Sequence, residues 1–171
     1  MNKDSTFTNA ADTSQHEAFM KHAIHLSKRA SLIEKSGGVF GAVIVKDGVI
    51  IGEGYNQVIR HSDPTWHAEM HAIREAAKKL GTPHLKGSTL YTSAECCPMC
   101  LSAAYWAHVD HIFYGATVAD SLEYGDFQDE RILTELRKAP HERTIKLTEL
   151  LRIEALEVWK EFSIMSDRAR Y

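Results

Sequence analysis

The sequence lacks the features of a membrane, secreted or nucleic-acid-binding protein. None of its apolar runs approaches the roughly 20 residues that a membrane-spanning helix needs, and residues 1–14 do not contain the apolar core of a signal peptide. A basic excess is also missing: the formal net charge is −3, whereas proteins that hold nucleic acid through its phosphates are usually basic. We therefore expect a cytoplasmic protein with a small-molecule substrate, no membrane partner and no stable nucleic-acid partner.

Cysteine is also scarce in this chain. The three cysteines, Cys96, Cys97 and Cys100, all lie within five positions. An odd and tightly clustered set, in a sequence without an export signal, favours metal binding over disulfide bonding.

The pattern of apolar residues predicts one α/β domain. The chain has 171 residues, 44% of them hydrophobic, with no internal repeat or linker, so it can bury one continuous core. Periodicity and turn residues predict helices over 15–35, 65–80, 98–107, 118–138 and 149–165, strands over 39–46, 49–58, 88–92 and 111–114, and a fifth strand over 144–148. Asp47-Gly48 predicts a hairpin between the first two strands.

Strands that alternate with helices indicate a three-layer α-β-α arrangement, with helices on both faces of the sheet. We expect a flexible N-terminus over 1–14, the domain itself over 15–162 and a C-terminal tail over 163–171.

The motif that carries chemistry is His67-Ala68-Glu69 followed by Cys97-Pro98-Met99-Cys100. Imidazole and thiolate are ligands that Zn²⁺ prefers, and a catalytic zinc site keeps three protein ligands and one open position. Cys97 and Cys100 lie three residues apart at the expected start of a helix, so both sulfur atoms face the same side, and a helix N-terminus favours thiolates. The sequence therefore predicts one Zn²⁺ per chain, held by His67, Cys97 and Cys100.

Glu69, two residues after the histidine ligand, is the candidate catalytic residue. Zinc lowers the pKa of its bound water towards about 7, and the resulting hydroxide can attack an amidine carbon. A carboxylate beside the metal can move protons from that water to the ring nitrogen and to the departing amine. The arrangement is close to the H-x-E…P-C-x-x-C motif that is typical of zinc nucleobase deaminases, with Cys96 in place of the proline.

A closed structural zinc site is the main alternative. It would need a fourth protein ligand, for which His71, one helical turn after His67, and Cys96 are the candidates. Glu69 and the strand–helix context favour a catalytic site, and they also disfavour an inactive zinc-fold module that only binds partners. Metalloprotease chemistry is disfavoured because its H-E-x-x-H motif needs glutamate where Ala68 stands.

These motifs resemble the cytidine deaminase-like superfamily and, within it, the bacterial guanine deaminase branch. The matching stretches run in order through most of residues 15–162: Gly37-Gly38-Val39-Phe40-Gly41-Ala42-Val43, Asn56, Asp63-Pro64-Thr65, His67-Ala68-Glu69, Tyr91-Thr92-Ser93-Ala94-Glu95, Cys97-Pro98-Met99-Cys100, Tyr105-Trp106-Ala107 and Glu142-Arg143-Thr144-Ile145. The resemblance implies a central five-stranded mixed sheet. It also implies a homodimer with C-terminal tail exchange, in which the tail of one subunit closes the partner's active site.

The resemblance also implies which residues contact the base. Asn56 and the backbone amide of Ala68 would hydrogen-bond it, while Phe40 and Trp106 would form aromatic walls. Tyr171 in the exchanged tail would help to exclude water. From the residues alone, core packing of the two aromatic side chains and a turn role for Asn56 are the alternatives.

The sequence departs from the family pattern where relatives recognise guanine. They carry Gly-Phe-Asp-Asp in place of Gly125-Asp126-Phe127-Gln128-Asp129, so the recognising acid aligns with Gln128, or with Asp129 after a one-residue shift. Three further residues depart from the family pattern. Val39 and Cys96 each stand where relatives usually carry proline, and Trp66 stands where a small residue is common before the histidine. The bulk of Trp66 could narrow the pocket, and the sequence leaves its effect open.

The resemblance thus predicts zinc-dependent hydrolysis of guanine to xanthine and ammonia. The alternatives of the same chemistry are deamination of cytosine, isocytosine, guanosine or another amino-heterocycle or nucleoside. Deamination of tRNA adenosine is disfavoured by the acidic net charge.

Overall fold

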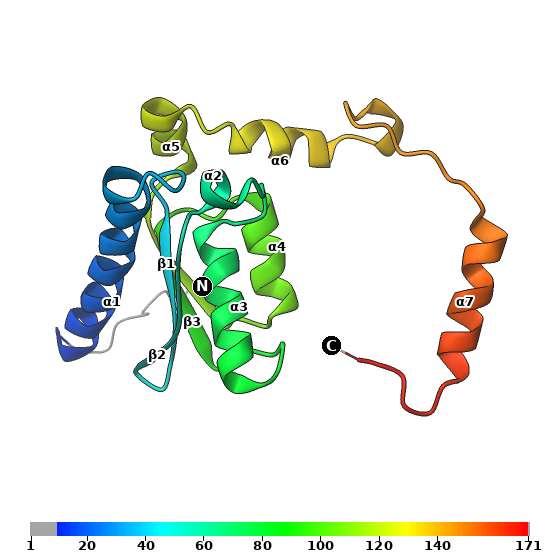
Figure 1. Cartoon of the computed structure of the whole chain (residues 1–171), viewed down its shortest axis with the longest axis horizontal. Helices are drawn as coiled ribbons and strands as arrows, with labels where there is room; N and C mark the ends of the chain where they lie inside the picture. The colour runs from blue at the N-terminus through cyan, green and yellow to red at the C-terminus, as the bar shows by residue number, and fades with distance from the viewer. Residues whose placement is uncertain (1–9, 171) are drawn as a thin grey trace, which may run out of the picture. The chain divides into compact units, whose positions relative to one another are not determined.

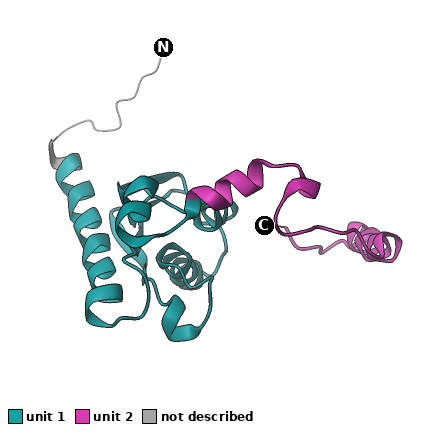
Figure 2. Cartoon of the chain, turned by 90° about the horizontal axis from the view of Figure 1, so that it is seen from above, with its two compact units in different colours: residues 1–129 teal, residues 130–171 magenta. Residues whose placement is uncertain are grey.

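A computed structural model describes residues 10–170 of the chain, with side chains from residue 13 onwards. The chain forms two compact units, Met1–Asp129 and Glu130–Tyr171 (Figure 2). Most of the segment predicted to be flexible, 1–14, lies outside the described residues, and its last part, 10–14, is helical. Tyr171 also lies outside them.

A mixed sheet of four strands forms the centre of the first unit (Figure 1). Its strands are β1 (Gly41–Lys46), β2 (Val49–Tyr55), β3 (Ser88–Ala94) and β4 (His111–Ala116). They are arranged in the order β2-β1-β3-β4, with β1 antiparallel to both of its neighbours and β3 parallel to β4.

The predicted fifth strand over 144–148 is wrong. These residues are irregular, and the side chains of Ile145 and Leu147 are exposed. An alternating apolar pattern produces a strand only where a neighbouring strand supplies hydrogen bonds, and no strand among residues 10–170 pairs with this segment.

The β1–β2 hairpin forms as the sequence predicts. Lys46 pairs with Val49 across the turn, and the two turn residues Asp47 and Gly48 both take positive φ angles, 50° and 74°. Two consecutive positive φ angles define the tight hairpin turn that Asp-Gly favours.

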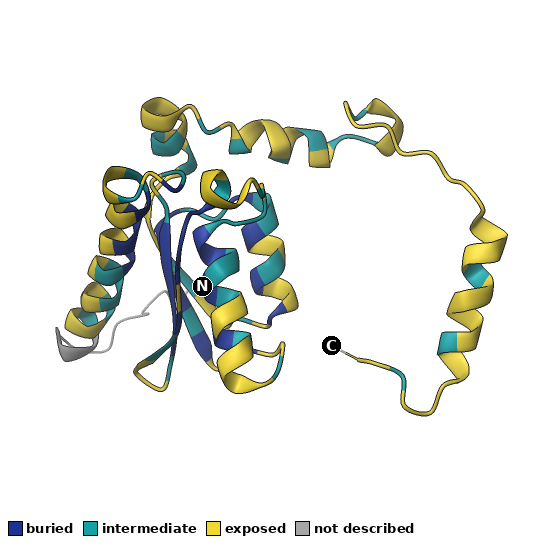
Figure 3. Ribbon diagram, viewed as in Figure 1, coloured by how far each residue is buried: buried dark blue, intermediate teal, exposed yellow. Residues whose placement is uncertain are grey.

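Helices cover both faces of the sheet, as the three-layer prediction requires (Figure 3). One face packs against α1 (Ala10–Lys28), whose helix continues into a π-helical turn, η1 (Arg29–Ile33). The other face packs against α3 (Ala68–Leu80), which neighbours α4 (Pro98–Trp106). Successive residues of β1 alternate between the two cores: Ala42 and Ile44 belong to the α3 side, Val43 and Val45 to the α1 side.

Glycines in β2 allow α3 to lie very close to the sheet. A Cβ atom at Gly52 would collide with the carbonyl oxygen of Ala72, and one at Gly54 with that of Ala68. This close packing fixes the start of α3, where His67 and Glu69 lie, against the end of β2.

The remaining helices complete the described chain. The sequence did not predict α2 (Val58–His61). The expected break near Gly125 separates α5 (Val118–Gly125) from α6 (Asp129–Arg137). The 3₁₀ turn η2 (Pro140–Glu142) and α7 (Arg152–Ile164) follow. Of the helices in residues 10–170, none is long and apolar enough to cross a membrane.

Candidate active site and metal centre

Two helix N-termini bring the predicted zinc ligands together. His67 is the N-cap residue of α3 and Cys97 is that of α4, where Pro98 occupies the first turn. His67 Nδ1 lies 3.5 Å from Cys97 Sγ and 3.6 Å from Cys100 Sγ, and the three candidate ligand atoms lie within 4.8 Å of one another. One imidazole and two thiols at this separation fit Zn²⁺ with a fourth position left open.

The surroundings of the two thiols favour a thiolate in the cluster. A hydrogen bond from Cys100 and the proximity of His67 lower the pKa of Cys97 to about 4, although burial opposes this effect. The same hydrogen bond and burial raise the pKa of Cys100. The site therefore already stabilises one thiolate at neutral pH, which is the ligand form that a metal requires.

Neither candidate fourth ligand belongs to the cluster. His71 Nδ1 lies 3.2 Å from Gln57 Nε2, and its ring lines a separate groove of about 420 Å³ between β2 and α3. Cys96 is half-buried, and burial raises the pKa of its thiol. Within the described part of the chain, the group that could hold a metal is thus limited to His67, Cys97 and Cys100, as a catalytic site requires.

A cavity of about 190 Å³ adjoins these ligands. Its lining combines carboxylates, one amide, apolar groups and two of the metal ligands. The lining residues are Phe40, Asn56, Val58, Pro64, His67, Glu69, Glu95, Cys97, Phe127 and Asp129. A small organic ring in this cavity would lie beside the metal.

Glu69 occupies the first turn of α3 and is only 3% exposed. It lines the cavity together with His67. Desolvation is the main cause that raises the pKa of its carboxyl group. A carboxyl group held beside the metal, away from bulk water, is suited to proton transfer.

Backbone hydrogen bonds fix the orientation of Asn56 at the end of β2. Its side chain is 3% exposed, and its Oδ1 accepts hydrogen bonds from the N–H groups of Gly38 and Val58, both at 3.2 Å. A Cβ atom at Gly37 would collide with this oxygen, so glycine is required there. Because Oδ1 is occupied by two donors, the amide nitrogen is the group that Asn56 offers to a ligand.

Asp129 lines the cavity, whereas Gln128 does not. Gln128 is exposed, and its Nε2 donates to Asp126 Oδ1 at 3.4 Å. Burial raises the pKa of Asp129, and the charge of Cys97 raises it further. Of the two residues left open by the sequence, Asp129 is therefore the acid in the cavity.

Four further residues line the cavity without having been predicted from the sequence: Phe127, Glu95, Val58 and Pro64. Phe127 packs edge-to-face on Phe40, with ring centroids 4.8 Å apart. Its position two residues before Asp129 was a usable signal, because an aromatic residue near a cavity-lining acid can pack against the same cavity. The other three have no local pattern that marks them as lining residues.

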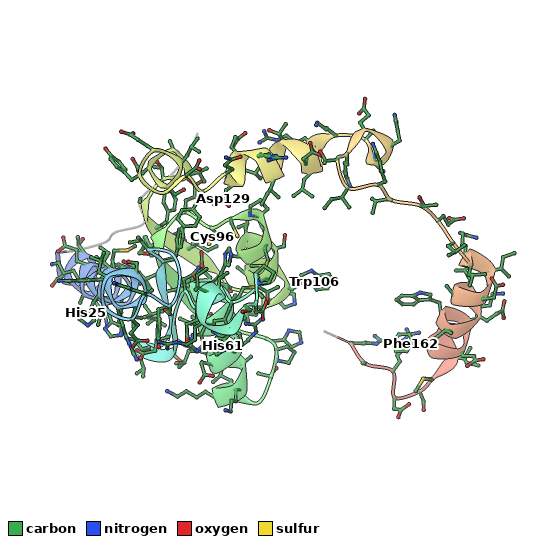
Figure 4. All side chains as sticks on the ribbon, turned by 45° about the horizontal axis from the view of Figure 1, so that its top comes forward. His25, His61, Cys96, Trp106, Asp129 and Phe162 are labelled. Atoms are coloured by element: carbon green, nitrogen blue, oxygen red, sulfur yellow. The ribbon has the colours of Figure 1, made fainter. Side chains whose placement is uncertain are left out.

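Two predicted contacts remain predictions. Ala68 is the first residue of α3, where a backbone N–H has no partner within the helix. Trp106, at the end of α4, is 66% exposed and does not line the cavity (Figure 4).

The bulk of Trp66 lies outside the cavity. Its ring packs at a tilt against His61, with centroids 4.1 Å apart, and the Arg74 guanidinium lies 5.3 Å from the ring centroid. Trp66 is absent from the cavity lining, so its bulk is accommodated outside.

Comparisons with known proteins agree with this geometry. Residues 13–116 match the cytidine and deoxycytidylate deaminase zinc-binding region. The guanine deaminase of Bacillus subtilis (strain 168) is 46% identical over 151 residues, covering 86% of this chain and 96% of that protein. The X-ray structure of guanine deaminase from Bacillus subtilis matches with a TM-score of 0.87 and 44% identity, over 91% of this chain and 98% of that one.

A tRNA-specific adenosine deaminase from Aquifex aeolicus (strain VF5) is 42% identical over 100 residues, which cover 58% of this chain and 65% of that protein. The chain therefore belongs to the cytidine and deoxycytidylate deaminase family of zinc-dependent enzymes. It is a hydrolytic aminohydrolase that requires Zn²⁺.

Proposed function

We propose that this enzyme hydrolyses guanine to xanthine and ammonia. The observation that carries the proposal is the placement of Asn56 and Asp129 in one small cavity beside the metal ligands. Guanine presents acceptors at O6 and N7 and a donor at its exocyclic amine. The Asn56 amide nitrogen matches the acceptors, and the Asp129 carboxylate matches the donors. The relative from Bacillus subtilis supports the same substrate.

The reaction consumes one water and releases one ammonia. Zinc held by His67, Cys97 and Cys100 would supply a water molecule of lowered pKa beside the substrate. Glu69, which lines the cavity together with His67, would hold a proton there and pass it to the ring nitrogen and to the departing amine. Phe40 and Phe127 enclose the ring plane, while Asn56 fixes its rotation.

We further propose that the enzyme is a homodimer in which the C-terminal tail covers the partner's cavity. The second unit exposes large apolar side chains along much of its length: Ile145, Leu147, Leu150, Leu151, Ile153, Val158, Trp159 and Ile164. Apolar surface on this scale is typical of a segment that packs against another protein surface. In such a dimer Trp106 and Tyr171 are the aromatic residues expected to complete the site, and light scattering would give the mass of two chains.

An ammonia-release assay with the zinc-loaded enzyme tests the substrate. Guanine is compared with cytosine, isocytosine, guanosine and an adenosine-containing tRNA anticodon stem-loop. Turnover of guanine well above the other compounds is the expected result. Inert guanine together with rapid turnover of a pyrimidine or of the stem-loop would refute guanine as the substrate.

A further inference from the structure

Glu95 connects the metal-bearing turn to the segment that closes the cavity. It follows β3 directly, two residues before Cys97, and it lines the cavity. Its Oε2 accepts a hydrogen bond from the backbone N–H of Val118 at 3.1 Å. Val118 is the first residue of α5, so the carboxylate satisfies a helix N–H that has no partner within the helix, at the positive end of the helix dipole.

Helix α5 leads directly to the specificity residues. It ends at Gly125, and Asp126 takes a left-handed conformation with φ 55°. The Phe127 N–H then bonds back to the Ser121 carbonyl at 3.3 Å, which ties the next residues to the helix. Displacement of α5 would therefore displace Phe127 and Asp129, the two residues that this segment contributes to the cavity.

The Glu95 hydrogen bond is not needed to cap α5. Thr117 and Asp120 already form a reciprocal capping box: the Thr117 hydroxyl accepts from the Asp120 N–H at 3.2 Å, and the Asp120 carboxylate accepts from the Thr117 N–H at 2.8 Å. The bond from Val118 to Glu95 instead joins α5 to a residue outside the helix, at the end of β3. It therefore fixes where α5 lies rather than whether it forms.

The backbone of Glu95 is itself well anchored. Its N–H donates to the Ala116 carbonyl at 2.8 Å, which extends the parallel pairing of β3 with β4 beyond the Ala94–Ala116 pair. A side chain on such a rigid base can position the element that it holds.

We propose that Glu95 is a positioning residue for substrate specificity. Through Val118 it holds α5, and with it Phe127 and Asp129, at a fixed place relative to the metal-ligand turn. The part of this proposal that concerns substrate affinity rests on the proposed function, in which Asp129 recognises guanine. The part that concerns how Glu95 holds α5 in place does not depend on the substrate.

Three variants of the full-length, zinc-loaded enzyme test the proposal. Glu95→Ala removes the tether, Glu95→Gln keeps an acceptor oxygen, and Asp120→Ala weakens the local cap of α5 but leaves the tether in place. We measure zinc content, hydrogen–deuterium exchange of residues 118–129, and KM and kcat for guanine.

Glu95→Ala is expected to keep its zinc, to exchange faster over residues 118–129, and to raise KM about tenfold, as expected for loss of a hydrogen bond to a charged group. Its kcat should change much less. Glu95→Gln should return KM and exchange towards wild type, and Asp120→Ala should accelerate exchange only near the start of α5 and leave KM within about twofold.

Unchanged exchange and KM in Glu95→Ala would overturn the proposal, and so would an equal rise of KM in Asp120→Ala. Loss of zinc in Glu95→Ala would assign the residue to the metal site instead and would also overturn it. If the wild-type enzyme does not deaminate guanine, the proposed function fails, and the exchange experiment alone decides the role of Glu95.

Discussion

Replacing Asp129 by asparagine tests substrate recognition most directly, because the change alters charge without altering shape. Asp129 lies in the cavity with Asn56 and Glu69. The amide of Asp129→Asn has nearly the volume of the carboxylate, so the packing of Phe127 on Phe40 should persist. One acceptor oxygen becomes a donor nitrogen, which cannot pair with the amino or ring N–H groups of guanine.

The expected loss is that of one hydrogen bond to a charged group, about 1.5–3 kcal/mol. Since about 1.4 kcal/mol corresponds to a factor of ten, kcat/KM for guanine should fall by roughly 10- to 150-fold. The effect on folding should be small. Asp129 begins α6, and a negative charge at a helix start stabilises the helix by about 0.3–1 kcal/mol, which the asparagine loses. In the other direction, burial raises the pKa of Asp129, so its ionisation at neutral pH opposes folding. The neutral amide removes this second, unfavourable contribution, so the two effects oppose each other.

The assay follows xanthine formation and ammonia release under steady-state conditions, with thermal unfolding as a check on the fold. Gln128→Ala is the matched control, because Gln128 is the neighbouring exposed residue with one long hydrogen bond to Asp126. It should change kcat/KM by less than about twofold. If Gln128→Ala costs more than Asp129→Asn, or if Asp129→Asn is as active as wild type, then Asp129 does not recognise the base.

Three further predictions concern the metal, the proton transfer and the tail. Wild-type protein should bind about one zinc per chain, and replacing His67, Cys97 or Cys100 by alanine should abolish this binding, because three ligands leave no redundancy. The control variant His71→Ala should retain its zinc. Metal analysis that finds His71 essential would favour a structural site. Glu69→Gln should keep zinc but lower kcat by about 10²–10⁴-fold or more, and near-normal turnover would remove Glu69 from the mechanism. Deletion of residues 164–171 should preserve zinc and thermal stability but sharply lower kcat/KM, and mixing with full-length Glu69→Gln should restore some activity. Verified mixed dimers without such rescue would contradict the shared lid.

Short-range signals in the sequence located most of the elements. Asp47-Gly48 specified the hairpin because its two residues tolerate the positive φ angles of the turn. The expected end of the helix over 65–80 agrees with the end of α3, where Gly81 forms a left-handed C-cap with φ 66°. The metal ligands were equally predictable, because their spacing places them at helix starts.

Elements that depend on distant contacts were not predictable from local patterns. The π-helical turn ends where the Glu34 N–H bonds to the Arg29 carbonyl at 2.9 Å. The Glu34 carboxylate pairs with Arg29 and, at 2.6 Å, with Arg60 beyond β2. No residue near Arg29 indicates this partner from the next loop. The predicted strand over 144–148 failed for the converse reason: its alternation was present, but a partner strand was not.

The segment after α5 brings Asp129, and not Gln128, into the cavity. In this chain Asp126 stands between Gly125 and Phe127. Asp126 is absorbed as the left-handed C-cap of α5, with φ 55° and ψ 30°, a conformation that aspartate tolerates better than most residues. The chain then runs irregularly over 126–128. Phe127 and Asp129 line the cavity, while Gln128 between them is exposed, much as residues alternate between the two sides of an extended chain. Asp126 therefore lies outside the cavity, and Asp129 is the acid of this stretch that lines it.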